Sequence, residues 1–148
     1  MVRRCLGTIL AVALAAMATQ CTPTPTGPAC EEAQYQGRVV DATNFDYGAV
    51  TLEIDDRGRT AGRIDGVKDR DGHFLGEVFW ADVEVHCERG HFDTINATAT
   101  ECGSENVKVR GSFTEDGYWD GWLEVWCGKV GKDDGTSLIL TFAAFKLD

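Results

Sequence analysis

The sequence lacks features that define several large classes of protein. Its one uncharged apolar run, residues 6–17, is shorter than the ~20 residues that a transmembrane helix needs. Basic residues are scarce, with 14 Lys and Arg against 24 Asp and Glu and a formal net charge of −10. Such an acidic balance argues against binding to nucleic acid, whose phosphates attract Lys and Arg, and against electrostatic adhesion to anionic lipid.

Sequence motifs of catalysis and cofactor binding are absent as well. No serine has the Gly-x-Ser-x-Gly context of a nucleophile elbow, and no glycine-rich loop is placed to hold a phosphate. Carboxylates are frequent because the chain is acidic, so no pair of them indicates glycoside hydrolysis. We therefore expect no enzyme, no catalytic residues and no cofactor.

The N-terminus is typical of a secretory signal. Arg3 and Arg4 precede the apolar run 6–17, and the composition changes to Thr and Pro at residue 22. We expect residues 1–20 to be a signal peptide. Ala16-Met17-Ala18 fits ordinary signal peptidase, whereas Ala18-Thr19-Gln20-Cys21 resembles a bacterial lipobox. That resemblance implies that Cys21 is lipidated and becomes the first residue of the mature protein.

Cysteine parity favours lipidation. Ordinary cleavage leaves an odd set of five cysteines with one unpaired thiol, whereas a lipid on Cys21 leaves four that can pair. Residues 22–29 contain all three prolines and are expected to be an extended spacer. We expect residues 21–33 to be a lipid-anchored tether and residues 34–148 to be one all-β domain.

From Gln34 onward, apolar and polar residues alternate with a period of two, which predicts antiparallel strands with one buried face. Glycines in Asp-rich turns, such as Gly58 and Gly117, separate the strands. The eight expected strands are residues 35–41, 48–55, 59–66, 73–86, 92–101, 106–114, 118–127 and 136–147. Short connections favour an antiparallel meander that closes into a small up-and-down barrel, with a two-sheet sandwich as the alternative.

Over about residues 48–127, the Asp-Gly hairpins resemble those of small bacterial envelope lipoproteins with lipocalin-like barrels. In a meander, connections alternate between the two ends of the barrel. Cys30 precedes the first expected strand and Cys87 follows the fourth, so they share one end. Cys102 and Cys127 share the other. We therefore predict the disulfides Cys30–Cys87 and Cys102–Cys127, one of three possible connectivities.

Two expected strands carry aromatic and acidic side chains on one face, an arrangement that suits the stacking faces and hydroxyls of sugars. The candidate binding-surface residues are Trp80, Asp82, Glu84, Tyr118, Asp120, Trp122, Glu124 and Trp126. The alternative is structural. Lys108 and Arg110 of the adjacent strand cover Trp122 and Trp126 through stem packing and cation–π contact.

The segment His86-Cys87-Glu88-Arg89-Gly90-His91 contains two of the three histidines. Its spacing of five residues at a strand end differs from the helical zinc motif, which places two histidines one turn apart. We expect a polar hairpin loop with no metal.

The expected function is a non-enzymatic lipoprotein of a bacterial cell envelope, held at an outer membrane or cell surface or else secreted. Its β scaffold would bind an unknown protein, glycan or small molecule. One alternative is a lipocalin-like carrier of a small apolar ligand, although bulky candidates for the interior favour a filled core. Those candidates are Phe79, Phe113, Trp119 and Leu123, with Leu138 or Ile139 and Phe142 or Phe145. Another alternative is a secreted inhibitor of a protease or hydrolase that inserts a rigidly held loop.

Overall fold

The structure is a computed structural model that describes residues 26–68, 74–94, 97–100, 107–125 and 138–148. These residues form one turn of 3-10 helix and nine β-strands. The elements are η1 (Pro28–Cys30), β1 (Ala33–Val40), β2 (Asp46–Ile54), β3 (Arg59–Lys68), β4 (Phe74–Glu84), β5 (His91–Thr94), β6 (Thr98–Ala99), β7 (Val107–Phe113), β8 (Trp119–Val125) and β9 (Leu138–Lys146).

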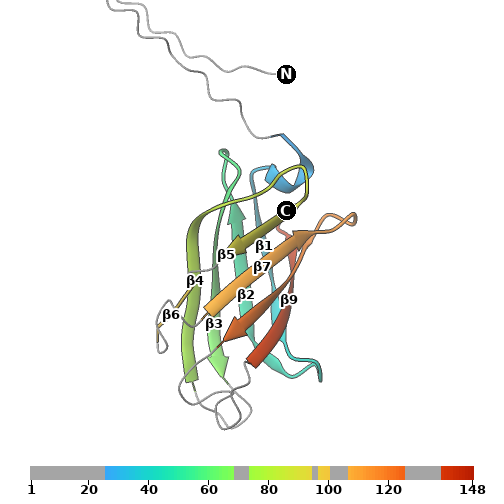
Figure 1. The fold of residues 1–148 in the computed structure, drawn as a ribbon. Coiled ribbons are helices and arrows are strands. Elements are labelled where there is room, and N and C mark those ends of the chain that lie inside the picture. The colour runs from blue at the N-terminus through green and yellow to red at the C-terminus, as the bar shows by residue number, and fades with distance from the viewer. Residues whose placement is uncertain (1–25, 69–73, 95–96, 101–106, 126–137) are drawn as a thin grey trace, which may run out of the picture.

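The strands form one curled antiparallel sheet with a barrel-like shape (Figure 1). Its order is β5-β7-β8-β9-β1-β2-β3-β4-β6, so the last long strand pairs with the first. A meander that curls on itself brings these two strands together. The expected all-β, barrel-like fold is confirmed.

The expected strand at residues 92–101 is divided in two. β5 pairs with β7, whereas β6 pairs with β4, so this stretch of chain supplies both edges of the sheet. Side chains connect the edges across the seam, where Trp80 of β4 stacks on Phe92 of β5 with ring centroids 5.8 Å apart. Among the described residues, the two sides of the seam therefore meet through side-chain packing.

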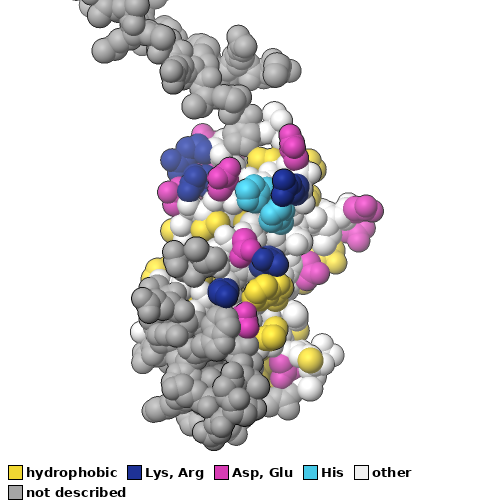
Figure 2. All heavy atoms as spheres, in the orientation of Figure 1, with side chains coloured by type: hydrophobic (Ala, Val, Ile, Leu, Met, Phe, Trp, Pro, Cys, Tyr) yellow, Lys and Arg dark blue, Asp and Glu magenta, His cyan; other side chains and the backbone are white. Residues whose placement is uncertain are grey.

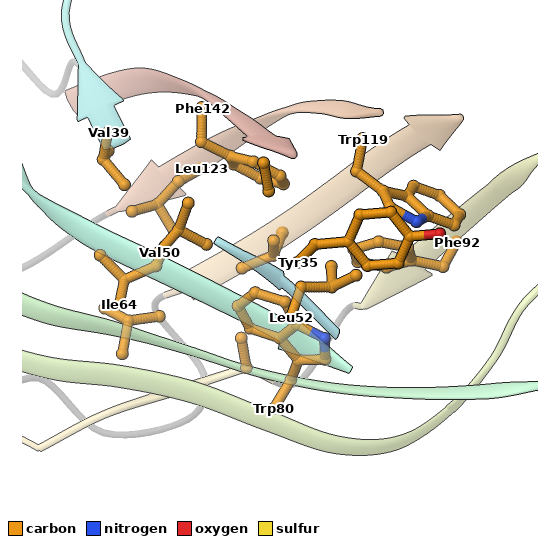
Figure 3. Packing of buried hydrophobic residues seen from close by; sticks show 14 of the residues in the cluster. Tyr35, Val39, Val50, Leu52, Ile64, Trp80, Phe92, Trp119, Leu123 and Phe142 are labelled. Carbon is orange, nitrogen blue, oxygen red and sulfur yellow. The ribbon is translucent and has the colours of Figure 1, made fainter. Parts of the chain in front are cut away.

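Most of the labelled aromatic rings gather at one end of the interior, and branched aliphatic side chains together with Phe142 lie toward the other (Figure 3). Trp119 lies at the centre of the aromatic end, with ring centroids 5.3 Å from Phe92, 5.4 Å from Phe113 and 6.5 Å from Tyr35. Burial raises the pKa of the Tyr35 phenol. The inward-facing candidates Trp119, Leu123 and Phe142 are all in this core.

One end of the barrel is capped by the N-terminal turn. Figure 1 shows η1 beside the connection between β4 and β5. A disulfide joins Cys30 to Cys87, with Cα atoms 5.3 Å apart, so this predicted pair is confirmed. Ala29 and Cys30 are buried, and the folded domain therefore includes residues that the sequence assigned to the tether. Cys21, Cys102 and Cys127 lie outside the described residues.

Candidate functional site

Trp80 faces the core, contrary to the expectation that it lies on the outer face of its strand. Its side chain is 4% exposed, whereas Phe79, expected inside, is 41% exposed. The cause is a bulge in β4. Thr60 pairs with Val83 but Gly62 pairs with Trp80, so β4 contains one extra residue, and Asp82 has a positive φ of 56°. Gly62 leaves room for the Trp80 ring, since a Cβ there would lie 2.0 Å from it.

The bulge turns Asp82 outward into a group of ion pairs. Asp82 contacts the guanidinium groups of Arg59 and Arg57, and Arg57 also binds Asp55 at 2.9 Å. Burial alone would raise the pKa of Asp55. Hydrogen bonds from the backbone of Arg59 and from Arg57 outweigh this effect and lower it. Glu84 is exposed on the same strand. The two carboxylates of Asp55 and Asp82 neutralise the two guanidinium groups. We therefore interpret these ion pairs as a structural link between the β2–β3 turn and β4, and not as a binding site.

On β8 the expected alternation is confirmed. Trp119, Leu123 and Val125 are buried, and Asp120 is exposed on the outer face. Trp122 also lies on the outer face, where Arg110 of β7 stands over its ring at 5.4 Å from the centroid. The alternative to a binding surface predicted that Arg110 covers the Trp122 ring through a cation–π contact, and the structure has this contact. Trp126 lies outside the described residues.

The two expected stripes therefore do not form one binding surface. Trp80 is inside, and Asp82 and Glu84 lie on β4, which the sheet order separates from β8 by four strands on one side and by the seam on the other. What remains is the half on β8 and the residue directly before it, namely Tyr118, Asp120, Trp122 and Glu124. That half gains apolar neighbours from β9.

Two residues of β9 that sequence reasoning placed as alternatives for the interior lie outside instead. Phe145 is 56% exposed and Ile139 is 57% exposed, while Leu140, Phe142 and Ala144 point inward. Phe145 contacts the Tyr118 ring at 5.0 Å between centroids, and Ile139 pairs across the strands with Glu124. The alternation of β9 was visible in the sequence, but its phase was ambiguous because both faces of this strand carry apolar residues.

Together these side chains form the β8–β9 strip, which we define as Tyr118, Trp122, Ile139 and Phe145. Asp120 lies between Tyr118 and Trp122 along the chain, and its cross-strand neighbours are Ser112 and Ala143, neither of which is charged. The strip therefore combines two exposed apolar side chains, Ile139 and Phe145, and two half-buried aromatic ones with a carboxylate that has no ion-pair partner among the described residues. Such surface is typical of binding sites in proteins.

A cleft lies at the capped end, beneath η1. Its volume is about 700 Å³, and Pro28, Arg89, Phe113, Glu115 and Lys146 are among its lining residues. Lys146 is paired with Glu31 at 3.3 Å across this end. The lining mixes both charges, and the cleft brings together no constellation of nucleophile, base and oxyanion donors.

The structure brings the two histidines of the β4–β5 connection together. The rings of His86 and His91 lie 4.7 Å apart, and their backbones form an isolated β-bridge. Cys87 between them is oxidised, as expected. No group of three or more metal-ligating side chains occurs among the described residues, and none of the described helical segments is long and apolar enough to cross a membrane.

Comparisons of the chain with models of protein families, with curated proteins and with solved structures find no match.

Proposed function

We propose that the chain is a non-enzymatic binding module of a bacterial cell envelope, anchored by a lipid on Cys21, whose β8–β9 strip contacts a protein partner. The observation that carries the proposal is the exposure of Phe145 and Ile139, both more than half accessible, on one sheet face. Burial of such side chains against a partner is favourable by roughly 25 cal/mol per Å² of apolar surface.

The composition of the strip favours a protein partner over a glycan. Aromatic residues at the centre of a contact with charged groups around it are typical of protein interfaces. Ile139 adds a branched aliphatic side chain, which cannot stack on a sugar ring as an aromatic ring can. The uncompensated carboxylate of Asp120 further predicts that the partner presents a Lys or Arg beside its apolar contact.

The alternative of a carrier for a small apolar ligand receives less support. The large aromatic and aliphatic side chains that point into the barrel support a packed interior over a ligand cavity. An inhibitor that inserts a loop remains an alternative of the same class, since it too is a binding module. Among the described loops, the connection between β1 and β2 carries an exposed aromatic residue, Phe45, but at 45% it is less exposed than Ile139 or Phe145.

Photo-crosslinking tests the proposed surface. A benzophenone amino acid is placed at Phe145 or Ile139 in the full chain expressed in a bacterial envelope, with Thr51 on the exposed face of β2 as the control position. We expect a protease-sensitive adduct of defined mass from both strip positions and none from Thr51. Asp120→Lys should decrease its yield, because it places a cation where the partner is expected to present one.

Two results would contradict the proposed surface. Equal adduct yields at Thr51 and Phe145 would mean that the partner does not bind preferentially at the strip. An adduct that resists proteases but is degraded by glycosidases would mean that the partner is a glycan. The lack of any adduct would also count against it.

Metabolic labelling with palmitate tests the anchor separately. If Cys21 is lipidated, the wild-type chain incorporates the label and Cys21→Ala does not. Labelling that survives the substitution, or no labelling of either chain, would remove the anchor from the proposal without affecting the strip.

A further inference from the structure

The pair of histidines at the end of β4 is held by a rigid framework. The amide of His86 donates to the carbonyl of His91 at 2.8 Å, and the amide of Gly90 donates to the carbonyl of His86 at 2.8 Å. The next hydrogen bond outward, from Phe113 to the carbonyl of Gly90 at 2.6 Å, attaches the turn to β7. These bonds position both Cα atoms through the backbone, so side-chain rotation is the main freedom that remains.

The disulfide anchors the same turn from the other side. Cys87, directly after His86, is joined to Cys30 of η1, which is itself buried. Gly90 has a positive φ of 62°, which allows the chain to reverse within the turn. The turn is therefore braced by β5, β7 and η1 together, and neither histidine can move away from the other without breaking a covalent or hydrogen-bonded link.

The two imidazoles are accessible and close enough to bind one ion. His86 is exposed and His91 is half-buried, and Figure 2 shows two adjacent histidine side chains on the surface. Their ring planes differ by 37°. With metal–nitrogen distances of about 2.0–2.1 Å, two imidazoles on one ion have ring centroids roughly 4.5–5.2 Å apart, a range that includes the 4.7 Å found here.

The surroundings leave the ring nitrogens available. Within the described part of the chain, no side chain forms a hydrogen bond or ion pair with either imidazole. The turn between the histidines contains one acidic and one basic residue, Glu88 and Arg89, both exposed, so their charges cancel locally. The formal net charge of −10 of the whole chain favours the approach of cations.

We propose that His86 and His91 form a two-imidazole chelate for a divalent late transition-metal ion, with Cu²⁺ bound most tightly. Imidazole ligands suit Cu²⁺, Ni²⁺ and Zn²⁺, and for a site of given ligands Cu²⁺ has the highest affinity of the series. Two protein ligands leave further positions for water, so the chelate is an open, exchangeable site. His91 lies across β7 from Asp120 of the strip, since Ser112 pairs with both residues, but binding of the ion does not depend on the proposed function.

Titration of the full oxidised chain with CuCl₂, followed by electron paramagnetic resonance, tests the chelate. We expect one Cu²⁺ per chain with a nitrogen hyperfine pattern, and weaker binding of Ni²⁺ and Zn²⁺. His86→Gln and His91→Gln should each weaken the binding of Cu²⁺ on the order of tenfold or more, because each removes one of two protein ligands. The third histidine, His73, supplies the matched control, and His73→Gln should bind Cu²⁺ like the wild type.

The variants also separate loss of the site from loss of the fold. Glutamine is polar and of similar size, so far-UV circular dichroism of His86→Gln and His91→Gln should match that of the wild type. The proposal is overturned if either folded variant keeps the affinity of the wild type. It is equally overturned if His73→Gln is the variant that loses binding.

Discussion

Replacing Trp119 with alanine is expected to reduce the free energy of unfolding by about 3–5 kcal/mol, the cost of removing a large buried aromatic side chain. Trp119 is fully buried and its ring contacts Tyr35, Phe92 and Phe113. These rings come from β1, β5 and β7, so the cavity would open between opposite walls of the barrel. Since small domains have only about 5–15 kcal/mol of stability, a large part of it would be lost.

Trp122 is the matched control for this substitution. It lies three residues later on the same strand, but half-buried on the outer face, where Arg110 forms a cation–π pair with its ring. Such a pair contributes about 0.5–1 kcal/mol at an exposed site, so Trp122→Ala should cost much less than Trp119→Ala. Urea unfolding followed by far-UV circular dichroism measures both. Equal losses for the two variants would be inconsistent with the burial described here.

Removing the disulfide should have the second-largest effect. Cys30 and Cys87 are separated by 57 residues, so the bridge closes a long loop. The Cys30→Ala/Cys87→Ala double variant should therefore lose about 2–4 kcal/mol of stability, mainly because its unfolded chain becomes less restricted. The loss should be accompanied by release of η1, since the bridge is the covalent link between this turn and the β4–β5 connection.

Limited proteolysis reports that second consequence directly. Cleavage between Gly27 and Ala33 should be much faster in the double variant than in the wild type, because opening of the cap then no longer depends on unfolding of the barrel. Tyr35→Phe, at a residue buried beneath the cap, keeps the disulfide and should not accelerate cleavage there. If the double variant is as stable and as resistant as the wild type, the bridge does not hold the cap.

The contrast between β8 and β4 explains how far the sequence predicts the strip and the core. In β8 a strict alternation predicts that Trp119 is inside and Trp122 outside, and the ladder to β7 is regular throughout. Around the end of β4 the same reasoning places the half-buried Val83 and the buried Val85 correctly and Trp80 wrongly. The extra residue at the bulge changes the phase between them. A bulge depends on the pairing strand, and the residues of β4 alone do not reveal it.

The outward position of Phe145 and the closeness of His86 and His91 were also beyond sequence reasoning. Both faces of β9 are apolar, so the period of two does not say which face is buried. The histidines are five residues apart, and only the reversal of the chain at Gly90 makes them cross-strand neighbours.

By itself the sequence determined the fold class, the turns at Gly58 and Gly117 and the Cys30–Cys87 pair. Alternation, turn residues and the order of strands in a meander are local or follow from counting. The tertiary structure alone decided which side of β4 holds Trp80, how the stretch after Gly90 is shared between two edges, and which apolar residues remain outside. These features result from competition between distant segments for the same hydrogen bonds and the same interior space, and no local pattern records the outcome.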